Sequence, residues 1–214
     1  MKRIALYLMI CALTITAGCS SVDEYISVAK RAAISNSYYD VLNTWTREKT
    51  VYSQFETAIR VIATLESDEF IHAYRAEYAN AYMKDTAYRS PEGDAAITDT
   101  DNGVGILLYV YMPDKQSNDL ASPRSLWQLA LVDETGNTAM PGEIKEIEYI
   151  TPAIEKLFPY VNKYYGKLYR ITFASAVDRA KLLGEGDPAK RTVTLVCAGI
   201  LGRAELEWKM GPPH

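Results

Sequence analysis

Residues 191–209, RTVTLVCAGILGRAELEWK, predict two short strands joined by a tight turn. Apolar and polar residues alternate through 191–198 and again through 203–209, and a period of two is typical of a strand with one buried face. Gly199 and Gly202 bracket the turn, where glycine is favoured for its conformational freedom. The end of the chain therefore predicts a β-hairpin.

The same alternation recurs upstream of this hairpin. Four more strands are predicted, over residues 106–112, 126–132, 143–150 and 167–174. Turn residues follow the first two, Pro113-Asp114 and the segment 133–137, and loops are predicted over 89–103 and 184–188. Strands at this short spacing indicate an antiparallel β-sandwich or a partial barrel.

Residues 54–66 fit two patterns. Ile59, Val61, Ala63 and Leu65 alternate as in a strand, whereas Tyr52, Phe55, Ile59 and Ile62 follow the spacing of a helix. The high content of β-branched residues favours the strand, because such side chains pack well on a pleated surface. Both interpretations stay open at this point.

Helices are predicted on either side of this segment. Residues 22–45 carry an apolar stripe at helical spacing, and Ser67-Asp68-Glu69 has the residues of a helix start, with that helix ending near 84–88. Thr151-Pro152 predicts a short third helix, since Thr is favoured at the cap and Pro at the first helical position. The expected class is α+β, with the N-terminal helices packed on the sandwich.

The N-terminus has the features of a secretory signal. Lys2 and Arg3 precede an apolar run over residues 4–15, and the small residues Thr16-Ala17-Gly18 lead to Cys19. The run from 4 to 17 contains fourteen residues, fewer than the roughly 20 that a membrane-spanning helix needs. A retained span and a plain signal without lipid are the alternatives.

The Thr-Ala-Gly-Cys sequence at 16–19 resembles the lipobox of bacterial lipoproteins. The resemblance covers residues 1–21 and implies cleavage after Gly18 and lipidation of Cys19. Ser20 in place of Asp implies sorting to the outer membrane, on its periplasmic face. The expected organisation is a signal peptide at 1–18, a helical segment at 19–50 and an α+β domain at 51–210.

Charge and composition exclude some partners. The net charge of −4 includes Lys2 and Arg3, so the chain from Cys19 onward carries −6. A mildly acidic chain without clustered Lys and Arg lacks the electrostatic surface that nucleic acid requires. We therefore expect no nucleic-acid partner, and membrane attachment through the lipid on Cys19 alone.

Few residues suggest a catalytic or metal site. Cys197 lies within a predicted strand and is expected to be a buried structural thiol. Glu69-x-x-His72 places two residues of metal-ligand type on one helix face. A di-iron site needs this motif twice, and the sequence has it once. His72 is therefore expected to be a partly exposed helical residue. Residues 99–103, Asp-Thr-Asp-Asn-Gly, faintly resemble a calcium loop, but Val110 stands where an EF-hand has Glu.

No catalytic triad, phosphate loop or dinucleotide motif occurs in the sequence. We expect no enzyme activity, no catalytic or metal-binding residue and no cofactor, with an envelope hydrolase as a distant third interpretation. The sequence thus predicts a lipid-anchored envelope protein with an assembly or interaction role and an envelope protein partner.

Tyrosine is the one unusual feature of the composition, with sixteen residues. Most are expected to pack the helices and strands together, among them Tyr74, Tyr78, Tyr82, Tyr164, Tyr165 and Tyr169. Tyrosine also joins an apolar ring to a polar tip, which suits contact surfaces and sugars. A ligand- or glycan-binding module that uses exposed tyrosines is therefore the alternative function.

Overall fold

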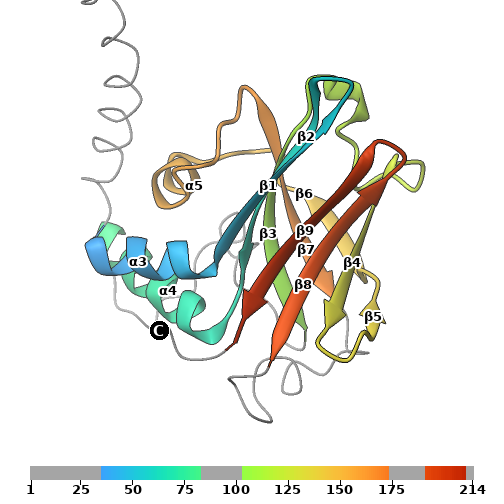
Figure 1. Cartoon of the computed structure of the whole chain (residues 1–214). Helices are drawn as coiled ribbons and strands as arrows, with labels where there is room; N and C mark the ends of the chain where they lie inside the picture. The colour runs from blue at the N-terminus through green and yellow to red at the C-terminus, as the bar shows by residue number, and fades with distance from the viewer. Residues whose placement is uncertain (1–34, 83–102, 174–190, 211–214) are drawn as a thin grey trace, which may run out of the picture.

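The computed structural model describes residues 35–82, 103–173 and 191–210 (Figure 1). Three α-helices occur in these ranges: α3 (Asn36–Trp45), α4 (Asp68–Tyr82) and α5 (Pro152–Leu157). A 3₁₀ turn, η2, covers Lys115–Ser117. The strands are β1 (Thr46–Ser53), β2 (Glu56–Leu65), β3 (Val104–Tyr111), β4 (Trp127–Asp133), β5 (Thr138–Ala139), β6 (Glu143–Glu146), β7 (Gly166–Phe173), β8 (Thr192–Gly199) and β9 (Gly202–Lys209).

The strands form two antiparallel sheets. One has five strands in the order β1-β2-β3-β7-β6, and the other has four in the order β5-β4-β8-β9. All pairings between neighbours are antiparallel. The predicted class, α+β with an antiparallel sandwich, is confirmed.

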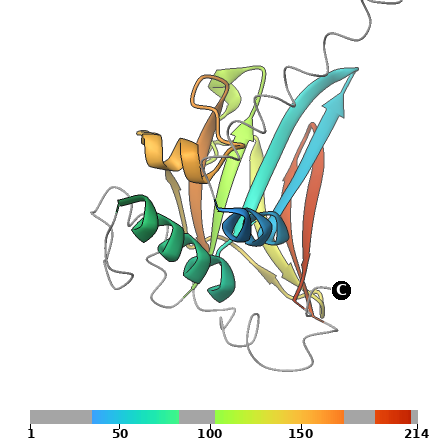
Figure 2. The same cartoon turned by 90° about the vertical axis from the view of Figure 1, so that its left-hand side faces the viewer.

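The five-stranded sheet is buried on both faces. Ile106, Leu108 and Val110 of β3 lie in the core between the two sheets. The alternate residues Leu107 and Tyr109 lie in a second core, formed with the helices on the opposite face. Figure 2 shows the helices on one side of this sheet and β8 and β9 on the other. Because successive side chains of a strand point to opposite faces, β3 is apolar throughout.

A buried ion pair lies within the helix-facing layer. Glu66, directly after β2, is 0% exposed at its side chain, and its Oε2 lies 3.3 Å from Nη2 of Arg170 on β7, which is 9% exposed. Charges of this kind are seldom buried unless they are paired, because leaving water costs several kcal/mol per ion. The pair joins strands that are separated by β3 in the sheet.

The two sheets meet at the edges formed by β1 and β9, which share no ladder pairing. Side-chain donors cross this seam instead. Nε of Arg47 donates to the carbonyl of Glu207 at 2.9 Å, and Nε1 of Trp208 donates to the carbonyl of Trp45 at 2.8 Å. Each strand therefore covers the otherwise exposed edge of the other, which protects both from pairing with another chain.

The helix predicted over 22–45 ends at Trp45, as expected. Residues 46–50, which were expected to belong to the helical segment at 19–50, instead lie in β1, because the backbone turns extended at Thr46 and residues 46–53 pair with β2. The strand expected over 143–150 covers only Glu143–Glu146, and residues 147–150 have no regular structure. The ambiguous segment 54–66 contains strand β2, as the β-branched residues indicated.

The helix starts follow the predicted signals. The Thr151 side chain accepts from the N–H of Ile154 at 3.2 Å, with Pro152 in the first helical position of α5. α4 begins at Asp68, and the hydroxyl of Ser67 accepts from the N–H of Phe70. The predicted end of this helix at 84–88, most of the loop at 89–103 and the loop at 184–188 lie outside the described residues.

Candidate functional site

Of the residues that the sequence analysis considered for a catalytic, metal or lipid site, only Glu69, His72 and Cys197 have described side chains. Cys19 and Asp99–Asp101 lie outside the described residues. His72 is exposed on α4, and its neighbour Glu69 accepts a hydrogen bond from Nε1 of Trp45 at 2.8 Å. The described ranges contain no group of three or more His, Cys, Asp or Glu placed to hold a metal ion.

Cys197 is buried on β8, within the core between the sheets. Burial raises the pKa of its thiol to about 12, so the thiolate that would act as a nucleophile is suppressed near neutral pH. The prediction of a buried structural thiol is confirmed.

The large exposed apolar residues, in contrast, gather at one end of the sandwich. Nine such residues occur in the described ranges, and one of them, Met140, follows β5 at the opposite end. Seven of them lie at the upper end in Figure 1, one near the end of β1 and the others in turns and connections. We call them the apolar loop end: Tyr52, Phe55, Leu126, Tyr164, Tyr165, Ile200 and Leu201.

Strand register explains why these separate segments lie at the same end. Tyr111 at the end of β3 pairs both with Arg60 of β2 and with Gly166, which follows Tyr165. Trp127, which follows Leu126, pairs with Gly199 before the β8–β9 turn. A Cβ added to Gly202 would lie 2.5 Å from Cγ1 of Val51, so this turn also packs against the end of β1.

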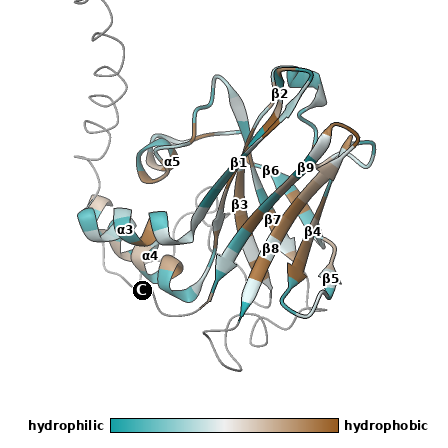
Figure 3. Ribbon diagram, viewed as in Figure 1, coloured by the Kyte–Doolittle hydropathy of each residue, from teal (hydrophilic) through white to brown (hydrophobic). Residues whose placement is uncertain are grey.

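Two of the segments are two-residue hairpin turns. Gln54-Phe55 joins β1 to β2, and Ile200-Leu201 joins β8 to β9. The exposed fraction is 105% for Phe55 and 89% for Ile200. In Figure 3 the β8–β9 turn is coloured hydrophobic although it lies at the tip of the hairpin. Isolated exposed apolar residues are common, whereas a group of them marks an interaction surface.

The turn at Gln54-Phe55 is strained as well as exposed. Both residues have positive φ, 50° and 69°. A two-residue hairpin turn with positive φ at both positions normally uses Asn-Gly, because Cβ makes this conformation unfavourable by about 1–2 kcal/mol per residue. Burial of the Phe55 ring does not offset that cost. Strain held by a fully exposed aromatic residue is an indication of a functional role.

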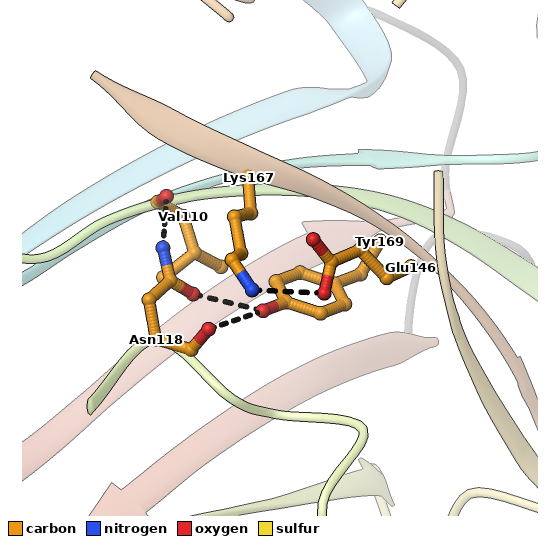
Figure 4. Close-up of polar contacts among 5 residues, drawn as sticks. All are labelled: Val110, Asn118, Glu146, Lys167 and Tyr169. Atoms are coloured by element: carbon orange, nitrogen blue, oxygen red, sulfur yellow. Dashed lines mark hydrogen bonds and ion pairs between the residues drawn. The ribbon is translucent and has the colours of Figure 1, made fainter. Parts of the chain in front are cut away.

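A buried polar network holds the long β3–β4 connection in place at this end (Figure 4). Nδ2 of Asn118 donates to the carbonyl of Val110 at 2.9 Å, and the hydroxyl of Tyr169 lies 2.9 Å from the Asn118 carbonyl oxygen and 3.0 Å from its Oδ1. Nζ of Lys167 pairs with Oε2 of Glu146 beside it, at 2.9 Å. Burial, with the charge of Glu146, raises the pKa of Tyr169, so its hydroxyl remains a neutral donor.

The tyrosines divide between two roles. Tyr74 and Tyr78 pack α4 onto the sheet, and Tyr169 is buried between the sheets, as predicted. Tyr164 and Tyr165 are 70% and 63% exposed, so their predicted packing role is wrong. They lie in the loop before β7. A loop lacks the regular alternation of a strand, so its side chains are not directed into the core at every second position. The side chain of Tyr82 lies outside the described residues.

Comparisons with known proteins add no functional assignment. Scans against protein-family models, curated proteins and solved structures each found no match to this chain. None of the described helices is both long and apolar enough to span a bilayer.

Proposed function

We propose that this protein is a lipid-anchored envelope protein that works by binding a partner and catalyses no reaction of its own. The lipobox-like sequence ending at Cys19 supports the anchor, with the periplasmic face of the outer membrane as the proposed location. The observation that carries the contact role is the apolar loop end, where seven of the nine large exposed apolar residues in the described ranges gather.

The composition of this surface suits a protein partner. Tyrosine and phenylalanine are enriched at the centres of protein interfaces, because they bury much area at little cost in side-chain entropy. The polar network around Asn118 fixes the β3–β4 connection at this end, and two of the segments that carry the surface are short two-residue turns, which favours a preorganised surface. A preorganised surface loses less entropy on association, so more of the contact energy becomes affinity. The partner proposed is another protein of the cell envelope.

Photo-cross-linking in intact cells tests the contact surface. A photoreactive phenylalanine analogue at position 55 or 200 should give a discrete adduct with an envelope protein, because both side chains lie at the tip of a turn. Met140 is the matched control, since it is 59% exposed but lies outside the apolar loop end. The proposal would be contradicted if position 140 gave adducts in the same yield as positions 55 and 200. It would also be contradicted if positions 55 and 200 gave no adduct under conditions in which a known envelope complex is captured.

The strained turn gives a second prediction. Gln54→Asn combined with Phe55→Gly should raise the free energy of unfolding by about 1–2 kcal/mol, because these residues accept positive φ without the steric cost. The same change should reduce the adduct yield from position 200, since Phe55 is removed from the surface. Urea unfolding of the purified protein and gel analysis of adducts measure the two effects.

Gly136→Ala is the control for the stability measurement. Gly136 has φ of 85° in another turn, and an added Cβ would meet nothing within 4 Å, so only backbone strain changes. We expect this variant to lose about 1 kcal/mol. A double variant at 54 and 55 that is no more stable than the wild type would show that the turn is not strained.

A further inference from the structure

The two hairpin turns of the apolar loop end direct their apolar side chains away from the rest of the protein. Phe55 is 105% exposed and Ile200 is 89% exposed, so each side chain contacts few other residues. The bases of the two hairpins nevertheless touch, because Gly202 packs against Val51 of β1. The surface is therefore convex, with two neighbouring apolar tips at the upper end in Figure 1.

The shape of the tips restricts the shape of the partner surface. A side chain that protrudes fully is buried only if the partner surrounds it, whereas a flat surface touches its outer part alone. Residues that dominate the affinity of an interface are aromatic or large apolar side chains that fill well-packed pockets of the partner. Phe55 and Ile200 therefore fit a partner that is concave at two neighbouring points.

The loop that carries Tyr164 and Tyr165 is held in one position at the same end. The N–H of Tyr164 donates to Oδ1 of Asn162 at 3.0 Å, and the carbonyl of Asn162 accepts from the hydroxyl of Tyr109 at 3.0 Å. Nζ of Lys115 donates to the carbonyl of Tyr164 at 3.2 Å. The two exposed tyrosines thus add a fixed surface with polar tips, of the kind found around the apolar centre of an interface.

The area of the apolar loop end is that of one complete interface. Its four aromatic residues have exposed fractions between 63% and 105%. An aromatic side chain presents about 150–250 Å², so these four offer on the order of 600 Å². Leu126, Ile200 and Leu201 add to this area, and one side of a standard protein interface buries about 800 Å². A single folded partner can therefore cover the whole surface.

The segments that carry this surface have little net charge. They are residues 54–56, 112–126, 158–165 and 200–203, with three acidic and four basic residues: Glu56, Asp114, Asp119, Lys115, Arg124, Lys163 and Arg203. Arg203 pairs with Glu205 at 2.6 Å, and Lys163 pairs with Glu155 at 3.3 Å. Charges of both signs that are interspersed in this way do not attract a strongly charged partner.

We propose that the partner is a folded envelope protein with an uncharged, apolar groove that receives both hairpin tips at once. This inference rests on the proposed contact role of the apolar loop end and adds the shape and the chemistry of the partner surface. Short peptides bind in grooves or beside free strand edges. Hairpin tips are neither, and the contacts of Arg47 and Trp208 cover the edges of β1 and β9.

The test places the photoreactive analogue at position 55 or 200 in intact cells and identifies the cross-linked partner peptides by mass spectrometry. Both positions should react with the same protein. Phe55→Ala should lower the adduct yield from position 200 about tenfold or more, the effect of losing a central contact residue, and Ile200→Ser should lower the yield from position 55. Both side chains are exposed, so neither variant loses packing inside the protein.

Salt and a distant variant are the controls. In isolated membranes, about 1 M salt screens charges beyond roughly 3 Å, and it should change the adduct yield less than about twofold. Met140→Ala removes an exposed apolar side chain at the opposite end and should leave both yields unchanged.

Four results would overturn the inference. They are different proteins captured from positions 55 and 200, an adduct with phospholipid or with a second copy of the chain, an unchanged yield from position 200 in Phe55→Ala, and a steep fall of the yield with salt. Different partners or an unchanged yield would leave the contact role itself standing. The absence of any adduct would overturn both proposals.

Discussion

Arg170→Met should lower the free energy of unfolding by about 3–5 kcal/mol, the largest stability loss that we expect from a single substitution. The side chain of Arg170 is 9% exposed, and its partner Glu66 is fully buried. Methionine fills most of the same volume but removes one charged partner of the buried Glu66 carboxylate. Removing one partner of a buried ion pair costs far more than the pair itself contributes.

A double-variant cycle identifies this cause. Adding Glu66→Gln to Arg170→Met removes the buried carboxylate charge that has lost its Arg170 partner, and should restore part of the lost stability. Lys167→Met breaks a partly exposed pair on the same strand, with Glu146 at 2.9 Å, and should cost no more than about 1 kcal/mol. Urea unfolding measures the wild type, both single variants of the pair, the double variant and Lys167→Met. An Arg170→Met loss as small as that of Lys167→Met would show that the buried charge is not what stabilises this layer.

Cys19→Ser should move the protein from the membrane fraction to the soluble fraction. Two or three acyl chains on Cys19 would give a stable anchor, because each buried CH₂ contributes about 0.8 kcal/mol and a single chain binds only marginally. The chain has no polybasic cluster that could replace the lipid by attraction to anionic headgroups. Fractionation of lysed cells after an alkaline wash measures the distribution.

Cys197→Ser is the matched control for this experiment. The same chemical change is made at the buried thiol of β8, which takes no part in anchoring, so the protein should remain in the membrane fraction. Unchanged association of Cys19→Ser would contradict the lipid anchor. If Cys19→Ser is released from the membrane but still gives the photo-cross-linking adducts with its partner, the contact role does not depend on the lipid anchor.

Local patterns in the sequence predicted most of the fold. The strands around Leu129 and Leu195 follow from alternation, whereas the strand around Ile106 is a continuous apolar run because both of its faces are buried. Strand β1 was not predicted, because its sequence TREKTVYS has few apolar residues and no clear period. It forms because β2 supplies its backbone partners and because Thr46 leaves α3 in an extended conformation.

The candidate sites could not be predicted in the same way. Phe55 and Ile200 are far apart in the sequence, and only the register of the strands brings their turns to the same end. The Gln54-Phe55 pair is unusual for a hairpin turn and was the one signal for this surface in the sequence. It could be recognised only once segment 54–66 was known to contain the second strand of a hairpin.

The seam between β1 and β9 has a consequence for biogenesis. Its contacts join Trp45 to Trp208 and Arg47 to Glu207, so the two sides of the seam are made at opposite ends of the chain. Closing so long a loop is slow, because its entropy is lost before the contact is gained. A chain that crosses the inner membrane N-terminus first would stay incompletely folded until its last strand emerged. Under the proposed export, that delay would keep the chain in the unfolded state that a secretion channel accepts. Truncation before Gly202 would remove β9 and with it the partner of β1 in the seam.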